Sequence, residues 1–378
     1  LHKEYRRQRQ MCIRDRVIYQ PLGVVGIIVP WNYPLFLAIA PLVGALAAGN
    51  RVMLKLSEAT PRTSQRLQAL LATVFPAEWV SVVLGEAEVG MAFAKLPFDH
   101  LLFTGATSIG RHVMRAAAES LTPVTLELGG KSPAILSADV PLNHAAERIA
   151  FGKTLNAGQT CVAPDYVLVP HDRVEGFVEA YRQAVQRLYP QVDGNPDYTS
   201  IINTRQHQRL SDYLDDARDK GATVITLTTA GAERRMSPTL LLNVDDSMRV
   251  MQDEIFGPLL PVVPYERLSD ALAYIAARPR PLALYYFGYD RSEQQHVLHH
   301  SHSGGVCLND TLMHVAQDDM PFGGVGASGM GHYHGHEGFL TFSKAKGVLI
   351  KQRFNPARLI YPPYGKALQK LVYKLFIR

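Results

Sequence analysis

Short apolar runs rich in β-branched residues alternate with longer segments of helical periodicity through the first third of the chain. The apolar runs predict strands, at residues 17–30, 51–56, 80–84, 100–104 and 124–128. The intervening segments predict helices, at residues 34–48, 60–74, 87–95 and 108–118. Strands that alternate with helices of this length form a parallel sheet through right-handed crossovers. Ligands of such a sheet bind where its strands end and its helices begin.

The same alternation continues more loosely after residue 127. Helices are predicted, at residues 143–155, 173–188, 204–220, 269–277 and 292–299. Strands are predicted, at residues 166–169, 222–226, 283–287 and 305–308. This pattern indicates a second α/β domain. Its boundary with the first domain falls near residue 126, where no low-complexity linker marks it.

Composition narrows the classes of protein that fit. A chain of 378 residues that is 47% hydrophobic can bury the cores of two domains. The three cysteines, at positions 12, 161 and 307, are an odd and sparse set that argues against a disulfide framework or a four-ligand zinc site. Because the sequence has neither an apolar run of membrane-spanning length nor a signal-peptide core, we interpret the chain as cytoplasmic.

The net charge of +5 comes from the two ends of the chain. Residues 1–16 carry six Lys/Arg against two acids, and residues 351–378 carry seven against none. Neither end has the interleaved aromatic residues or a recognised motif of a nucleic-acid-binding protein, so we expect no nucleic-acid partner. Residues 1–16 lack periodicity and are predicted to be a disordered tail or a foreign start.

Three residues could carry covalent chemistry. Cys161 lies in a loop of small and polar residues, where a carbonyl carbon could reach a thiol. Glu127 ends a predicted strand ahead of a glycine pair and could act as a general base. Asn32 lies in a turn after a strand, where its amide could donate to an oxyanion. The alternatives are a buried structural thiol, a surface acid and ordinary turn chemistry.

A second group of residues could hold a cofactor. Gly105 and Ser108 lie in a strand–turn–helix segment whose backbone N–H groups suit a pyrophosphate, although it lacks the G-x-G-x-x-G pattern. Lys55 and Glu58 follow a strand, where a carboxylate could bind ribose hydroxyls or could simply form a surface ion pair. Glu254 and Phe256 flank a glycine turn. They could hold a second ribose and a planar ring, or could belong to a core.

Two further patterns are open to more than one interpretation. The histidines at positions 314, 332, 334 and 336 lack the carboxylate and cysteine pattern of a zinc site, so we expect a structural loop and no metal. The chain's last apolar stripe alternates with a lysine stripe at helical spacing, and its members are Leu368, Leu371, Val372, Leu375 and Phe376 with Lys366, Lys370 and Lys374. Such a helix could lie on an anionic membrane surface or dock on protein.

Together these residues resemble the aldehyde dehydrogenase superfamily. The resemblance runs from about residue 17 to residue 350 and rests on motifs in the family's order: Pro30-Trp31-Asn32-Tyr33-Pro34, residues 55–58, residues 103–110, Glu127-Leu128-Gly129-Gly130-Lys131, Gly158-Gln159-Thr160-Cys161, Glu254-Ile255-Phe256-Gly257-Pro258 and Pro321-Phe322-Gly323-Gly324. The residues after Cys161 and the segment from Ser328 to Phe339 are similar to the class 3 branch, and within it to bacterial coniferyl aldehyde dehydrogenases.

The resemblance implies a Rossmann-like parallel-sheet cofactor domain, a second α/β catalytic domain and NAD, with NADP as the alternative. It implies that Cys161 attacks the aldehyde, that Asn32 and the Cys161 N–H hold the oxyanion, and that Glu127 activates the water that hydrolyses the thioester. The cofactor would be held by Lys55, Glu58, Gly105, Ser108, Glu254 and Phe256. The substrate would be an aromatic aldehyde such as coniferyl aldehyde, or a medium-chain aliphatic one.

The implied division of the chain is a basic tail at 1–16, a cofactor domain at 17–126, a catalytic domain at 127–309 and a returning oligomerisation segment with a basic tail at 310–378. Family members begin with a helical region that residues 1–16 do not resemble. The expected assembly is a homodimer, provided that this region is not essential, with peripheral membrane contact through the C-terminal tail. The alternatives are a catalytically impaired fragment and a cofactor-independent thiol esterase.

Overall fold

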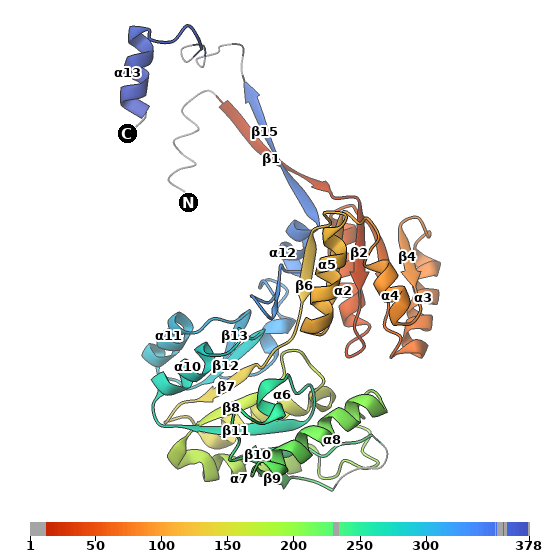
Figure 1. The fold of residues 1–378 in the computed structure, drawn as a ribbon, viewed down its shortest axis with the longest axis vertical. Helices are drawn as coiled ribbons and strands as arrows, with labels where there is room; N and C mark the ends of the chain where they lie inside the picture. Colours follow the sequence, from red (N-terminus) through yellow and green to blue (C-terminus); the bar gives the residue numbers. More distant parts are fainter. Residues whose placement is uncertain (1–12, 230–233, 352, 354–357, 359–360, 377–378) are drawn as a thin grey trace. The chain divides into compact units, whose positions relative to one another are not determined.

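The computed structural model describes residues 13–229, 234–351, 353, 358 and 361–376. The chain forms two compact units: residues 21–342 make the larger one, and the two chain ends make the smaller one. The larger unit contains a six-stranded and a seven-stranded sheet, which Figure 1 shows as two separate groups of strands. The predicted α/β fold is therefore confirmed.

The six-stranded sheet has the order β14-β6-β5-β2-β3-β4. Its strands are β2 (Val24–Ile28), β3 (Arg51–Lys55), β4 (Val80–Val83), β5 (His100–Thr104), β6 (Val124–Glu127) and β14 (Gly329–Met330). All neighbours are parallel except β14, which runs antiparallel to β6. The connecting helices are α2 (Phe36–Ala47), α3 (Pro61–Val74), α4 (Ala87–Phe93) and α5 (Thr107–Ala118).

Both faces of this sheet are covered, which explains why its strands are apolar without alternation. Leu42 of α2 and Leu67 of α3 belong to one buried cluster. Phe93 of α4 and Val113 of α5 belong to another. Helix α12 (Gly335–Thr341) packs on α2. The sheet thus keeps only its strand ends free for ligands.

The seven-stranded sheet has the order β13-β12-β7-β8-β11-β10-β9. Its strands are β7 (Pro133–Leu136), β8 (Tyr166–Pro170), β9 (Thr223–Thr226), β10 (Thr239–Leu242), β11 (Leu259–Tyr265), β12 (Ala283–Phe287) and β13 (Gly305–Leu308). Only β9 is antiparallel to its neighbour. The helices are α6 (Leu142–Thr154), α7 (Val174–Leu188), α8 (Thr204–Asp219), α9 (Arg249–Gln252), α10 (Leu268–Ala276) and α11 (Arg291–His300), with short 3-10 turns at Leu155–Gly158, His171–Arg173 and Met313–Ala316.

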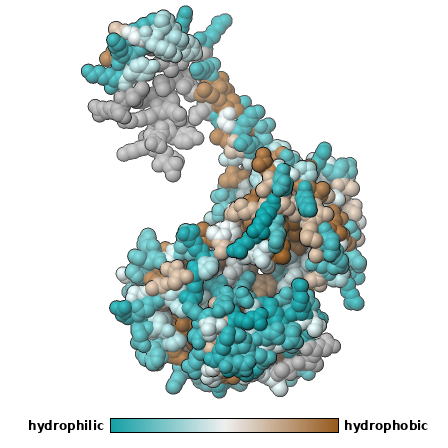
Figure 2. Space-filling model, viewed as in Figure 1, coloured by the Kyte–Doolittle hydropathy of each residue, from teal (hydrophilic) through white to brown (hydrophobic). Residues whose placement is uncertain are grey.

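Helices also cover both faces of this second sheet. Ile149 of α6 and Phe177 of α7 belong to one buried cluster, whereas Leu210 of α8 and Val297 of α11 belong to the other. The outer surface over α8 is hydrophilic, as Figure 2 shows, because that helix buries only a narrow apolar stripe. The core therefore lies in layers against the two faces of the sheet.

Two sequence predictions about local structure were wrong. Residues 13–16 are not a disordered tail, because β1 (Ile13–Pro21) begins at Ile13 and pairs with β15 (Ser343–Lys351) in the smaller unit. Backbone pairing of this kind needs no apolar alternation. The histidine-rich segment is not all loop, since α12 begins at Gly335 and includes His336. Residues 1–12 lie outside the described part.

Candidate functional site

The side chains proposed for chemistry gather at one edge of the six-stranded sheet. The ends of β2, β3, β5 and β6 are aligned, with Ile28 opposite Lys55 and Phe103, and Thr104 opposite Glu127. The turn that contains Asn32 follows β2, and the turn that contains Gly105 follows β5. These strand ends therefore form one common edge, which is where ligands of a parallel sheet are expected to bind.

Cys161 lies in a loop just before β8, and an unusual backbone shapes this loop. Asn156 and Ala157 have φ angles of 52° and 51°, which are costly for residues other than glycine. Gly158 follows with φ 74°, and a Cβ there would lie 2.3 Å from the Gly257 carbonyl oxygen. Only glycine fits at that position. The cysteine loop therefore lies directly against the loop that carries Phe256.

Hydrogen bonds join the cysteine loop to the turn after β2. The Asn32 amide Nδ2 donates to the Gln159 carbonyl at 3.1 Å, and the Asn156 amide donates to the Asn32 carbonyl at 3.1 Å. The Tyr33 hydroxyl lies 2.7 Å from the Thr160 hydroxyl. An amide nitrogen carries two hydrogens, so Asn32 keeps a second N–H for a ligand. The two segments form one wall around Cys161.

Glu127 is the last residue of β6, and its side chain is only 3% exposed. Neither carboxylate oxygen has a hydrogen-bond partner among the described residues. Burial without a hydrogen-bond donor from the described residues raises the pKa of Glu127 well above its ordinary value. A carboxylate in this state is a stronger base than one in water, as proton abstraction requires.

Glu254 lies over the two glycines that follow Glu127. A Cβ on Gly129 would lie 2.1 Å from the Glu254 Oε1 atom, and the Gly130 N–H donates to the Glu254 carboxylate. Burial, followed by the negative charge of Asp165, raises the pKa of Glu254 to about 8. The structure thus places a second carboxyl group, half-buried, over the glycines that follow the first.

The charges of both carboxylates act on the Cys161 thiol. Burial, then the charge of Glu254 and then that of Glu127 raise the pKa of Cys161 to about 12. Two backbone N–H groups, those of Cys161 and Val162, act in the opposite direction. The thiol is therefore neutral in the protein alone, and a nucleophilic thiolate needs either a base or a nearby positive charge.

The residues proposed for the cofactor lie on the same strand ends and on the facing loop. Lys55 is 3% exposed, and its Nζ atom lies 3.4 Å from the Glu58 carboxylate. Ser108 is exposed in the first turn of α5, where backbone N–H groups lack partners inside the helix. The Gly105 N–H donates to the Glu127 carbonyl at 3.0 Å. This arrangement suits an anionic dinucleotide whose pyrophosphate meets a helix N-terminus.

Phe256 lies in the loop that faces the turn containing Asn32. Its ring meets that of Trp31 edge to face, with centroids 5.3 Å apart. Its φ angle of 49° is unusual for a bulky residue, and such strain is concentrated in functional loops. The ring therefore lies between the loop before β11 and the turn that carries Asn32.

Sequence reasoning missed two charged or polar groups near this site. Lys153, in the last turn of α6, is buried, and burial lowers its pKa to about 8, an effect that the charges of Asp165 and Glu254 oppose. Tyr333 is buried, its hydroxyl has no hydrogen-bond partner within the described part of the chain, and the charges of Glu127 and Cys161 act on it. Helical spacing around Lys153 could have marked it as core-facing, but no local pattern marks Tyr333.

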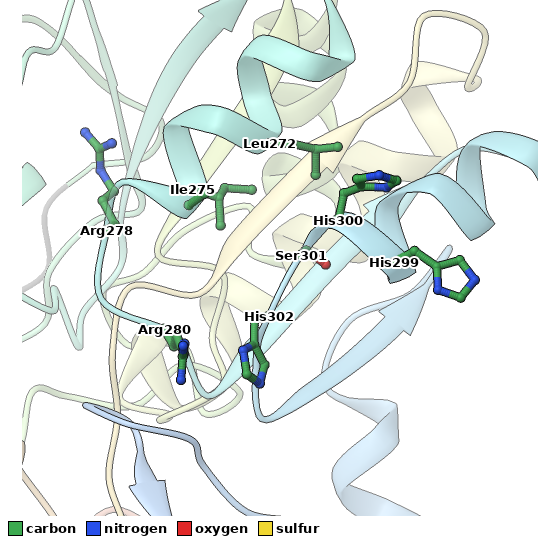
Figure 3. Close-up of a pocket in the computed structure, with 9 residues that line it drawn as sticks. Leu272, Ile275, Arg278, Arg280, His299, His300, Ser301 and His302 are labelled. Atoms are coloured by element: carbon green, nitrogen blue, oxygen red, sulfur yellow. The ribbon is translucent and has the colours of Figure 1, made fainter.

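A separate pocket of about 410 Å³ lies at the C-terminal ends of α10 and α11. Figure 3 shows side chains from both helix ends and from the segments that follow them. The lining consists of Leu272, Ile275, Ala276, Arg278, Arg280, His299, His300, Ser301 and His302. None of these residues is among those proposed for catalysis or cofactor binding. Among the described residues, no group of three histidines, cysteines or acids is arranged to hold a metal ion.

The sequence pattern described as "Aldehyde dehydrogenase family" matches residues 1–348. The chain belongs to this family. A "Probable coniferyl aldehyde dehydrogenase" of Pseudomonas aeruginosa is 74% identical over 363 residues, which cover 96% of this chain and 76% of that protein. The "Coniferyl aldehyde dehydrogenase" of a Pseudomonas species is 51% identical over 364 residues, with coverages of 94% and 76%.

Solved aldehyde dehydrogenases share the fold. The substrate-bound AldH of Staphylococcus aureus is 40% identical with a TM-score of 0.91, and the match covers 97% of this chain and 80% of that one. The Mycobacterium tuberculosis aldehyde dehydrogenase complexed with NAD+ is 33% identical with a TM-score of 0.83, with coverages of 91% and 74%. This aldehyde dehydrogenase is therefore an oxidoreductase that converts an aldehyde to the acid with a nicotinamide dinucleotide as acceptor.

Proposed function

We propose that this aldehyde dehydrogenase oxidises coniferyl aldehyde or a related aromatic aldehyde, with Cys161 as the nucleophile and Glu127 as the base. The observation that carries this proposal is that two carboxylates, Glu254 and Glu127, lie near one thiol and that the charges of both act on it. The aromatic substrate is supported by the names of the most similar curated relatives. A medium-chain aliphatic aldehyde is the alternative substrate.

The chemistry begins with proton removal from Cys161. Burial beside two acids holds the thiol neutral in the protein alone, and its proton would pass to solvent when a positive charge binds nearby. The thiolate then attacks the aldehyde carbon, and the resulting oxyanion accepts from the free Asn32 N–H and from the Cys161 backbone N–H. Once hydride has left the carbon and a thioester remains, Glu127 takes a proton from the water that hydrolyses this thioester.

The six-stranded sheet and the returning segment after residue 310 would form the cofactor domain. Lys55 and Glu58 would hold the adenosine ribose, Gly105 and Ser108 the pyrophosphate, and Glu254 the nicotinamide ribose. Phe256 would flank the nicotinamide. When bound, NAD supplies the hydride acceptor and a positive ring that favours the thiolate. The Glu58 carboxylate would repel a 2′-phosphate, so we assign NAD ahead of NADP.

One assay tests the activity. Purified protein is mixed with NAD or NADP and with coniferyl aldehyde, benzaldehyde or an aliphatic aldehyde, and the absorbance of the reduced cofactor is followed. We expect the highest kcat/KM with NAD and coniferyl aldehyde. A folded sample that reduces neither cofactor with any aldehyde would refute the proposal. An esterase that needs no cofactor is not favoured, because it would leave the set of strand-end residues from Lys55 to Ser108 without a role.

We also propose a homodimer in the cytoplasm that contacts anionic membranes peripherally. The contact would be made by α13 (Ala367–Phe376), on which Leu368, Leu371 and Leu375 are exposed and Lys370 and Lys374 are basic. Among the described residues, no helix is both long enough and apolar enough to cross a membrane. Co-sedimentation with vesicles of anionic and of zwitterionic lipid tests the contact, and light scattering tests the dimer.

A further inference from the structure

Tyr333 has a buried hydroxyl that the fold does not use. The side chain is 1% exposed, and the hydroxyl has no hydrogen-bond partner among the described residues. Leaving a donor buried and unpaired costs stability, and phenylalanine would fill the same space without that cost. Packing alone therefore does not account for the hydroxyl.

The backbone brings Tyr333 to the base. Strand β14 pairs with β6 so that Gly329 lies opposite Glu127. The chain then turns at Gly331, where φ is 84° and a Cβ would lie 2.8 Å from the Thr125 hydroxyl oxygen. Tyr333 follows two residues later. It joins the large buried cluster against which Cys161 also packs.

Aromatic neighbours fix the ring of Tyr333. The Phe322 ring meets it edge to face with centroids 5.9 Å apart, and the His334 ring does so at 5.0 Å. A ring held on two sides by aromatic contacts has few orientations open to its hydroxyl. The hydroxyl is therefore preorganised.

Electrostatics are consistent with this placement. Burial, then the charge of Glu127 and then that of Cys161 raise the pKa of Tyr333. The hydroxyl thus stays protonated and can donate. Both groups that act on it, the base and the nucleophile, take part in the proposed hydrolysis of the thioester.

We propose that the Tyr333 hydroxyl positions the hydrolytic water by donating a hydrogen bond to its oxygen, which rests on the function proposed above. In this step the water oxygen forms a bond to the thioester carbon and one water proton passes to Glu127. The carbon–sulfur bond breaks, and its electron pair returns to Cys161 as the thiolate. Tyr333 keeps its proton throughout. It orients the water so that a lone pair faces the carbon and a hydrogen faces the carboxylate.

Tyr333→Phe tests the proposal because it removes only the hydroxyl. We expect a normal first turnover, seen as a burst of NADH, followed by a steady-state rate lower by on the order of 10- to 100-fold. The melting temperature should stay the same or rise, since an unpaired polar group is lost. Hydroxylamine added after the burst should release the stalled acyl group, because it attacks a thioester without an activated water.

The matched control is Tyr181→Phe, which removes the hydroxyl of an equally buried tyrosine in α7 and should leave the burst and the steady state unchanged. An unchanged steady state in Tyr333→Phe would overturn the proposal. Loss of the burst together with the steady state, or failure of hydroxylamine to release an acyl group, would also overturn it. A wild-type protein that forms no NADH with any aldehyde would instead refute the proposed function itself.

Discussion

Replacing Glu127 with glutamine should separate the two halves of the reaction. Glutamine keeps the shape of the buried side chain but cannot accept a proton. A general base contributes about 10²- to 10⁴-fold to a proton-transfer step, so hydrolysis of the thioester should slow by that order. Hydride transfer precedes this step. We therefore expect one NADH for each Cys161 in a burst, and then a stall.

The same substitution should change stability with a sign that depends on pH. The folded-state pKa of Glu127 lies well above the ordinary 4.5, so the folded protein holds this proton at pH values where the unfolded chain has lost it. Stability therefore falls as pH rises above 4.5 towards the folded pKa, by about 1.4 kcal/mol for each unit at most. The glutamine amide avoids this loss but buries unpaired N–H groups, at a cost of about 1–3 kcal/mol.

The variant should thus be less stable than the wild type near pH 5 and equally or more stable near pH 8. Rapid mixing with NADH absorbance measures the burst, and thermal unfolding at the two pH values measures stability. Glu266→Gln is the control, because Glu266 is exposed and should show neither effect. Full steady-state turnover in Glu127→Gln would refute the assignment of the base. A stall in Glu254→Gln would then move the base to Glu254.

Three further substitutions test the site. Cys161→Ala should abolish NADH formation with any aldehyde while the melting temperature is kept, and residual turnover would assign the nucleophile elsewhere. Gly158→Ala should lower the melting temperature by several degrees in a thermal scan, because its Cβ would lie 2.3 Å from the Gly257 carbonyl oxygen in a positive-φ backbone. Gly129→Ala should raise the KM for NAD with little change in melting temperature, since its Cβ displaces only the flexible end of Glu254. A large loss of stability in Gly129→Ala would contradict this view of the contact.

Much of the fold could be predicted because its strands are apolar runs between polar helices. Strands β5, β12 and β13 occupy the predicted residues without error. Strand β11 was missed, since it contains Pro261 and Pro264, and proline is unusual in a central strand. Strand β14 has two residues and exists only through its pairing with β6. Elements of that kind depend on tertiary contacts that no local pattern records.

The candidate site, like the fold, could be predicted from the sequence only in part. Residues at strand ends, such as Lys55 and Glu127, could be placed at a common edge because parallel strands of one sheet end together. The approach of Glu254 to Gly129, and of Tyr333 to Glu127, joins segments far apart in the chain. Their meeting is decided by how loops pack. The roles of all these side chains stay predictions until the substitutions are made.

The proposed base and nucleophile belong to different sheets. Glu127 ends a strand of the six-stranded sheet, whereas Cys161 precedes a strand of the seven-stranded one. The bonds from Asn32 to Gln159 and from Tyr33 to Thr160 cross between them. These two bonds join the two sheets beside the site. A hinge motion between the sheets would have to break them before Cys161 could move away from Glu127. Substitutions that remove these two bonds should therefore change the rates of the two chemical steps as well as the affinity for ligands.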